Sequence, residues 1–351
     1  MTIRFRDSRQ ARRRLYVEAV YPSGVLALLD KTAWVYSGMG LEVKDADFAL
    51  RLGRLPAKEG VIRLYPGDVL QIWRRPIVGQ PAGMDEEGQW HPARIACTLP
   101  EALAHAEPGQ PIWFDDGKIG GRIEAVHDDR IEVRITHARP RGERLRAGKG
   151  INLPDTRIEL PALTERDREV LPFVARHADM VGLSFVHRES DVDELLALLQ
   201  QHTPPDRPLP GIVLKIETRR AFDNLPRLVL SAMQTDRAGV MIARGDLAIE
   251  SGFERLAEVQ EEVLWLCEAA HMPVIWATQV LETMARQGLP ARAEISDAAM
   301  GQRAECIMLN KGPFIVEATR TLDDILRRMQ DHQTKKRSLL RRLRVAEQTF
   351  A

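Results

Sequence analysis

The chain has 351 residues, and its 50 lysines and arginines are balanced by 50 aspartates and glutamates, so the formal net charge is zero. This length is enough for two domains with a sizeable core, and the charge balance argues against a general binder of nucleic acids or membrane surfaces. No apolar run approaches the roughly 20 residues of a membrane span, and the arginine-rich start lacks the apolar region of a secretory signal. The three cysteines are too far apart to form a metal-binding pair, and Cys267 and Cys306 are expected in the core of a cytoplasmic protein.

The amino-terminal segment, residues 1–53, carries few clear signals. Apolar and aromatic residues at 15–21 and at 24–29 predict two strands on either side of a Pro-Ser-Gly turn. The glycine-rich residues 36–40 predict a second turn. This segment is therefore expected to contain two strands, without a recognisable site.

Residues 54–153 also predict a β-rich domain. Two apolar runs, 61–65 and 69–73, flank a Pro-Gly-Asp turn and are expected to be paired strands. Residues 121–126 and 131–135 alternate apolar with polar side chains around a short polar turn, which is typical of a hairpin.

From residue 154 to residue 332 the pattern changes to strands that alternate with helices. The apolar runs recur about every 30 residues, as expected for successive βα units with a parallel sheet. The five predicted strands are 180–185, 211–214, 239–242, 274–276 and 306–309. Residues 333–351 follow as a basic tail that we expect to be helical.

Three consecutive predicted strands each end in polar residues. Lys215 and Glu217 end the first, Gly245 and Asp246 follow the second, and Thr278 follows the third. The carboxyl ends of parallel strands are where α/β proteins build their active sites. A single Lys-x-Glu is more often a solvated strand face, but three such strand ends in succession favour a site.

The chemistry of these groups suits a metal and a phosphoryl group. Glu217 and Asp246 can share Mg²⁺ or Mn²⁺, because Mg²⁺ takes one or two carboxylates and completes its octahedron with water and substrate oxygens. Lys215 is two residues from Glu217, so both side chains point to one side of an extended strand. A cation beside the metal would neutralise a phosphoryl group in transfer.

Longer segments around these residues resemble the pyruvate kinase family. Between residues 211 and 309 the family's motifs follow in order as GIVLKIETRRAFDNL, GVMIARGDLAIE, VIWATQVLETM, ARAEISDAA and CIML. Further matches occur earlier as DDGKI, KGINLP, LPALT and SFV, between residues 115 and 186. The resemblance covers the larger part of the chain.

The resemblance implies an α/β fold, a pyruvate-kinase-like (β/α)8 TIM barrel with residues 54–153 inserted as a small β-barrel lid domain. In the family three barrel strands precede the lid, whereas residues 1–53 leave room for one or two, because each βα unit takes roughly 30 residues. Residues 49–53 resemble the end of the third strand, with Asp45 as a weak counterpart of an acidic residue before it. The barrel in residues 154–332 is therefore expected to be incomplete, and the family's carboxyl-terminal regulatory domain is expected to be absent.

The resemblance also assigns roles to the predicted site. It implies that Glu217 and Asp246 hold Mg²⁺ or Mn²⁺ and that Lys215 is the catalytic residue that stabilises the migrating phosphoryl group. The backbone of Gly245 and Asp246, with the Thr278 hydroxyl, would bind the substrate carboxylate.

Other matching residues are expected to be structural. Arg244 would brace the site, and Arg292, Glu294 and Asp297 would form ion pairs near the end of the last strand. The family also uses K⁺, but its Asn-Phe-Ser-His-Gly segment is not found, so no potassium site is identified and the nucleotide-binding residues are unknown.

The implied reaction moves a phosphoryl group between phosphoenolpyruvate and ADP to give pyruvate and ATP, with activity impaired in this chain. Two alternatives stay open at this stage. One is a metal-dependent aldolase or lyase that acts on a pyruvate enolate, and the other is a non-catalytic remnant that acts as a binding protein. We expect no nucleic-acid or membrane partner, and we expect self-association or a partner chain to complete the barrel.

Overall fold

A computed structural model describes residues 2–330, apart from 8–10, 23, 30, 34, 44–48, 56–59 and 85–87. Asp45 and the predicted tail at 333–351 lie outside the described residues. The chain divides into two compact units, Met1–Gly60 and Val61–Ala351. No described helix has the length and apolar character needed to cross a bilayer.

The first unit is an antiparallel sheet with the strand order β3-β2-β1-β4-β5. Its strands are β1 (Thr2–Arg6), β2 (Arg12–Tyr21), β3 (Gly24–Leu29), β4 (Gly40–Val43) and β5 (Ala49–Arg51). The β2–β3 hairpin confirms the two strands predicted there. The comparison of residues 49–53 with a barrel strand is wrong for this structure, because β5 pairs antiparallel with β4, whereas barrel strands pair parallel.

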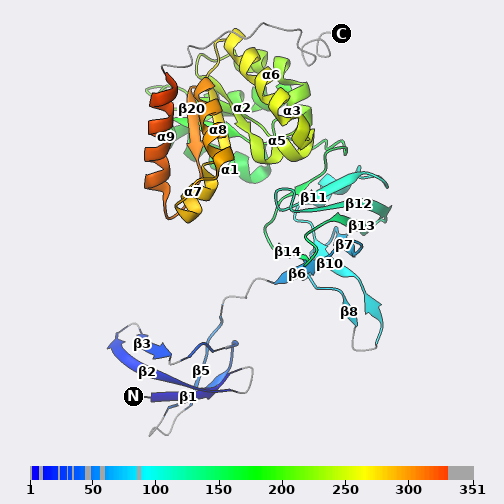
Figure 1. Ribbon diagram of the computed structural model, residues 1–351, viewed down its shortest axis with the longest axis vertical. Coiled ribbons are helices and arrows are strands. Elements are labelled where there is room, and N and C mark those ends of the chain that lie inside the picture. The colour runs from blue at the N-terminus through cyan, green and yellow to red at the C-terminus, as the bar shows by residue number, and fades with distance from the viewer. Residues whose placement is uncertain are drawn as a thin grey trace. The chain divides into compact units, whose positions relative to one another are not determined.

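Residues 61–153 form a β domain, which opens the second unit (Figure 1). Its main sheet has the order β10-β7-β13-β12-β11-β15, and β14 pairs with β6. Alternating side chains pack inward from these strands around a core that includes Leu70, Ile72 and Ile131. The strands are β6 (Val61–Leu64), β7 (Val69–Trp73), β8 (Gly83–Met84), β9 (Trp90–His91), β10 (Ala93–Ala96), β11 (Pro111–Phe114), β12 (Ile119–Val126), β13 (Arg130–His137), β14 (Glu143–Arg146) and β15 (Ile151–Asn152), with the short helix η1 (Pro100–Leu103).

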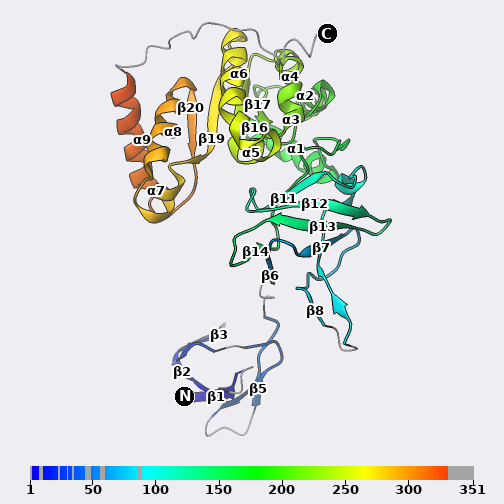
Figure 2. The same ribbon diagram turned by 45° about the vertical axis from the view of Figure 1, so that its right-hand side comes forward.

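Residues 154–330 form an α/β domain around a parallel sheet with the order β16-β17-β18-β19-β20. The strands, which confirm the five predicted from the sequence, are β16 (Met180–Leu183), β17 (Gly211–Ile216), β18 (Ala238–Ala243), β19 (Val274–Val280) and β20 (Cys306–Leu309). The helices are α1 (Glu165–His177), α2 (Glu189–His202), α3 (Arg219–Asp223), α4 (Leu225–Ala232), α5 (Arg244–Ser251), η2 (Phe253–Arg255), α6 (Leu256–Ala269), α7 (Glu282–Gln287), α8 (Arg292–Met300), η3 (Gly301–Arg303) and α9 (Ile315–Gln330). The sheet curves like part of a barrel wall (Figure 2).

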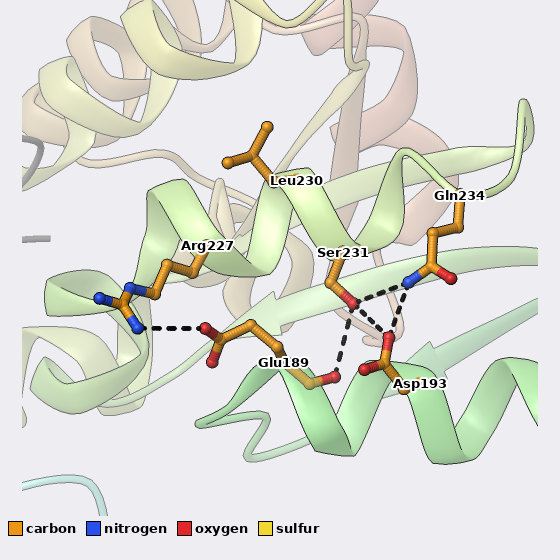
Figure 3. Close-up of a pocket in the computed structure, with 6 residues that line it drawn as sticks. All are labelled: Glu189, Asp193, Arg227, Leu230, Ser231 and Gln234. Atoms are coloured by element: carbon orange, nitrogen blue, oxygen red, sulfur yellow. Dashed lines mark hydrogen bonds and ion pairs between the residues drawn. The ribbon is translucent and has the colours of Figure 1, made fainter. Parts of the chain in front are cut away.

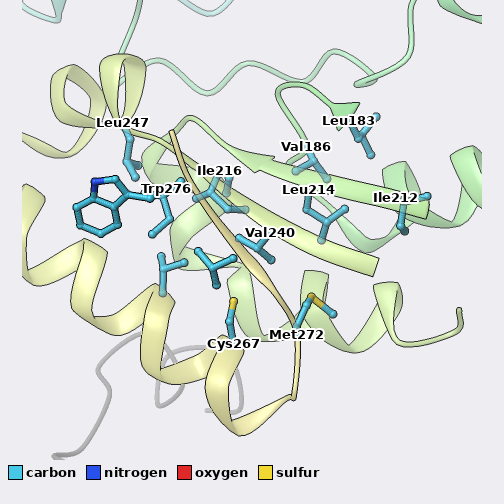
Figure 4. Close-up of a cluster of buried hydrophobic side chains, with 14 of the residues drawn as sticks. Leu183, Val186, Ile212, Leu214, Ile216, Val240, Leu247, Cys267, Met272 and Trp276 are labelled. Atoms are coloured by element: carbon cyan, nitrogen blue, oxygen red, sulfur yellow. The ribbon is translucent and has the colours of Figure 1, made fainter. Parts of the chain in front are cut away.

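The core of the α/β domain lies where the sheet meets its helices (Figure 4). Leu214, Val240 and Trp276 come from neighbouring strands and are almost completely buried. Cys267 on α6 is buried with them, as expected, but the prediction that Cys306 is a core residue is wrong, because it is exposed. Cys306 lies on β20, which forms one edge of the sheet in the described part of the chain.

Candidate active site

Lys215 and Glu217 form an ion pair at the carboxyl end of β17. The Nζ atom of Lys215 lies 2.7 Å from Oε1 of Glu217 and donates a 2.7 Å hydrogen bond to the hydroxyl oxygen of Ser184. The other oxygen of Glu217, Oε2, accepts a 2.7 Å hydrogen bond from the backbone N–H of Phe185. The residues after β16 therefore fix both members of the pair that ends β17.

The Glu217 carboxylate is buried, whereas Lys215 keeps about a quarter of its side chain exposed, at 27% against 5% for Glu217. A buried carboxylate needs charge compensation or hydrogen bonds, and Lys215 and Phe185 supply both. Phe185 has a φ of 51°, a backbone conformation that costs free energy for a bulky residue and often occurs at functional sites. Here it aims the Phe185 N–H at Glu217.

Gly245, in the first turn of α5, lies beside Thr278, which is near the end of β19. The backbone N–H of Gly245 donates a 2.9 Å hydrogen bond to the Thr278 hydroxyl oxygen. Thr278 has a φ of 64°, so the strand turns sharply at this point. The register brings the two residues together, because Ala243 pairs with Ala277 in the parallel ladder between these strands.

Arg244 is buried beneath this corner of the site. Its guanidinium donates to the backbone carbonyls of Ala277 and Thr278 and to the Asp297 carboxylate, and it stacks 4.7 Å from the ring centre of Trp276. These contacts occupy the guanidinium within the protein, which is what a bracing role requires.

The remaining residues of that motif surround the start of α8. Glu294 accepts hydrogen bonds from the backbone N–H groups of Thr283 and Ala291. Arg292 is exposed in the first turn of the helix. Only Asp297 of the three predicted ion-pair formers is therefore joined to the site, through Arg244.

Asp246 lies in the first turn of α5 and contacts the β domain. Its Oδ1 atom accepts a 3.2 Å hydrogen bond from the side-chain amide of Asn152, which is also 3.5 Å from Oε1 of Glu250. Burial raises the pKa of Glu250 to about 7; the Asn152 hydrogen bond opposes this rise, and the negative charge of Asp246 adds to it. Asn152 and Glu250 were not predicted from the sequence.

Glu217 and Asp246 present the oxygen donors that a hard divalent cation prefers. Both follow adjacent parallel strands, where Ile216 pairs with Ile242 in the ladder. Within the described residues, no group of three or more histidine, cysteine or acidic side chains is arranged to hold a metal. Two carboxylates suit Mg²⁺ or Mn²⁺, because such an ion takes its other ligands from water and substrate oxygens.

A second charged cluster lies in the β domain. Asp115 has a φ of 51° and pairs with Lys149 at 2.8 Å and with Lys118 at 3.1 Å. Burial alone would raise the pKa of Asp115, but the hydrogen bonds and positive charges of the two lysines outweigh it and hold this pKa below its ordinary value. The two lysines leave a cationic surface beside a carboxylate that stays ionised.

A surface pocket lies away from these groups, between α2 and α4 (Figure 3). Its polar side chains satisfy one another, since Ser231 and Gln234 both donate to Asp193 and Arg227 pairs with Glu189 at 3.5 Å. The predicted site residues do not line this pocket. We therefore place the candidate active site at the ends of the strands.

A large part of the chain matches a known protein family. Residues 82–314 match the family described as pyruvate kinase, barrel domain. The chain belongs to the pyruvate kinase family. The matched stretch contains every predicted site residue from Lys215 to Thr278.

Pyruvate kinases among the curated proteins are similar over most of the chain. That of Bacillus licheniformis is 32% identical over 289 residues, which are 80% of this chain and 46% of the relative. That of Hypocrea jecorina is 38% identical over 220 residues, which are 60% of this chain and 38% of the relative. The chain thus spans about half the length of the curated pyruvate kinases that it matches.

The fold is also that of a solved pyruvate kinase. A crystal structure of the Cryptosporidium parvum enzyme superposes with a TM-score of 0.65 at 24% sequence identity, covering 78% of this chain and 54% of that one. This likeness identifies the fold: a pyruvate kinase barrel domain, of which five parallel strands are described here.

Proposed function

We propose that the chain transfers a phosphoryl group between phosphoenolpyruvate and ADP, with Mg²⁺ or Mn²⁺ held by Glu217 and Asp246. The observation that carries the proposal is the placement of Lys215, whose ammonium group is fixed by Ser184 and Glu217 at the rim of the sheet. A bound divalent cation would neutralise the charge of the phosphoryl oxygens. Such positioning and charge compensation account for most of the catalysis of phosphoryl transfer.

Each residue of the candidate site has a distinct role in this proposal. The Lys215 ammonium group stabilises the phosphoryl group as it moves, where a preorganised charge is most effective. The backbone at Gly245 and Asp246, with the Thr278 hydroxyl, binds the substrate carboxylate. Arg244 holds the strand ends that carry these groups in place through the carbonyls of Ala277 and Thr278.

We assign no described residue to K⁺ or to the nucleotide. Because phosphoryl transfer depends on orienting the nucleotide phosphates, we propose that this chain turns over more slowly than the roughly 1–100 per second of typical kinases.

Two measurements test this function. Purified protein is assayed for ATP formation from phosphoenolpyruvate and ADP with Mg²⁺ and K⁺, and Mn²⁺ binding is titrated for the wild type and for Glu217→Ala. We expect slow ATP formation that requires the divalent cation, and much weaker Mn²⁺ binding by the variant. Equal Mn²⁺ affinity of the two proteins would contradict the metal site, and the absence of ATP formation would contradict the kinase reaction.

A second candidate is a metal-dependent enzyme of the pyruvate enolate, such as an aldolase or lyase. It is favoured because the residues at the carboxyl ends of the strands are those proposed to bind the metal, the phosphoryl group and the substrate carboxylate, whereas no described residue is assigned to the nucleotide. Exchange of pyruvate methyl protons with solvent, measured in D₂O without nucleotide, tests it. Exchange without ATP formation would favour the enolate enzyme, whereas neither activity would favour a binding protein.

A further inference from the structure

Asn152 joins the β domain to the helix that carries Asp246. It lies on β15, at the edge of the main sheet of the β domain, where it pairs with Trp113 of β11. The residue is 6% exposed, and a buried amide needs partners for its hydrogen-bonding groups. Those partners are the carboxylates of α5, since the amide nitrogen donates to Asp246 at 3.2 Å and lies 3.5 Å from Glu250.

One face of α5 carries these contacts and continues toward η2. Asp246 and Glu250 are four residues apart and thus neighbours on the helix surface. Ile249, on the same face, lies against Gly117 of the β domain, where a Cβ atom would come within 3.3 Å of its side chain. The Phe253 ring lies 3.8 Å from that position. The face of α5 that presents Asp246 is therefore the face on which the β domain packs.

The two carboxylates on this face repel each other, and the Asn152 amide is the neutral donor placed between them. A carboxylate that accepts a fixed hydrogen bond on one oxygen loses rotational freedom and keeps its other oxygen available. Groups that orient metal ligands in this way typically contribute 10–100-fold to metal affinity.

We propose that Asn152 is a positioning residue, which holds the Asp246 carboxylate for the divalent cation and thereby couples packing of the β domain to metal binding. The inference rests on the proposed metal site at Glu217 and Asp246. Asn152 itself is buried against α5 and acts through Asp246.

The first test is Mn²⁺ titration of the full chain, followed by electron paramagnetic resonance. Asn152→Leu keeps most of the side-chain volume but removes the donor, and Asn152→Ala is a second variant for the case in which leucine disturbs folding. We expect either variant to bind Mn²⁺ about 10–100-fold more weakly than the wild type. The matched control is Thr156→Val, because Thr156 is also buried but donates its 2.6 Å hydrogen bond to Gln110.

The second test uses the reciprocity of linked equilibria: if β-domain packing strengthens metal binding, the metal must strengthen the packing equally. Saturating Mn²⁺ should slow amide exchange in β11 and β15 of the wild type and of Thr156→Val. It should have no such effect in Asn152→Leu or Asn152→Ala. A purely structural role of Asn152 would speed exchange in both the presence and the absence of Mn²⁺.

The outcomes separate the inference from the proposed function. Affinity within about twofold of the wild type in both Asn152 variants, or equal slowing of exchange by Mn²⁺, overturns the inference while the metal site stands. Unchanged affinity in Glu217→Ala overturns the metal site itself, and the inference with it.

Discussion

Oε2 of Glu217 accepts a hydrogen bond from the backbone N–H of Phe185, 32 residues earlier in the chain, at 2.7 Å. This bond joins the end of β17 to the loop after β16 and fixes the carboxylate that also pairs with Lys215. The Lys215 ammonium group is thus oriented in two ways. The left-handed turn at Phe185 fixes Glu217, with which Lys215 pairs, and the Ser184 hydroxyl accepts a hydrogen bond from Lys215.

Replacing Lys215 by methionine should reduce turnover more than substrate binding. The Lys215 charge is most effective in the transition state, and loss of one such preorganised contact typically costs about 10²–10³ in rate. The measurement is kcat and KM for phosphoenolpyruvate, with Lys31→Met as a control at an exposed lysine of the amino-terminal unit. Because Glu217 loses its partner, circular dichroism checks the fold. A raised KM with normal kcat would assign Lys215 to uniform binding instead.

The sequence predicted which polar residues lie near the strand ends, because the pattern that marks the end of a strand is local. Lys215, Glu217, Asp246 and Thr278 each follow an apolar run within a few positions, and parallel strands bring their ends to one edge of the sheet. Asn152 was not predictable in this way, because its bond to Asp246 joins residues 94 positions apart. Only the packing of one domain on the other creates that contact.

Two other differences between the predictions from the sequence and the structure also have specific causes. The resemblance of residues 49–53 to the end of a barrel strand rests on a few residues, which contain no information about the direction of the partner strand, and β5 pairs antiparallel with β4. Similarly, the pattern around Cys306 predicts β20 but not that this strand is a sheet edge in the described residues. Burial of an edge residue depends on neighbours that periodicity does not show.

Glu250 should make the α/β domain less stable as the pH rises. Its pKa of about 7 in the folded protein is above the ordinary value of 4.5, so the folded state binds more protons than the unfolded state between these values. The free energy of unfolding therefore falls as the pH rises from about 4.5 to about 7.

Glu250→Gln removes this dependence. Relative to the wild type, the variant should gain about 1–3 kcal/mol between pH 4.5 and pH 7.5. Urea unfolding followed by the helical circular dichroism signal measures this, because the described α-helices lie in the α/β domain. Glu254→Gln, at an exposed position of η2, is the control. A difference between Glu250→Gln and the wild type that does not vary with pH would contradict the prediction.

His187, in contrast, should make the α/β domain less stable as the pH falls. Burial first, and then the positive charges of Arg220 and Arg188, lower its pKa from 6.5 to about 4, against the opposing charge of Asp191. The unfolded state therefore binds more protons between these values, and the free energy of unfolding falls as the pH drops from about 6.5 to about 4.

His187→Gln should abolish this loss of about 1–3 kcal/mol on acidification, whereas His177→Gln, at an exposed histidine of α1, should retain it. The same urea titrations, repeated between pH 4 and pH 7, provide the values. If the wild type and His187→Gln lose stability in parallel as the pH falls, His187 is not the group responsible.

The last prediction is that the 351-residue chain self-associates. Within the described residues, β16 pairs only with β17 and β20 only with β19, so both outer strands expose backbone groups that can pair with another chain. Met180, at the start of β16, is 67% exposed and adds apolar surface to that edge.

Sedimentation velocity should show a dimer or larger species. Met180→Lys should shift it toward monomer, because a lysine on an edge strand opposes pairing. Leu230→Lys, at a 57% exposed position on α4 away from the sheet edges, should leave it unchanged. A wild-type chain that sediments as a single monomeric species would refute the prediction.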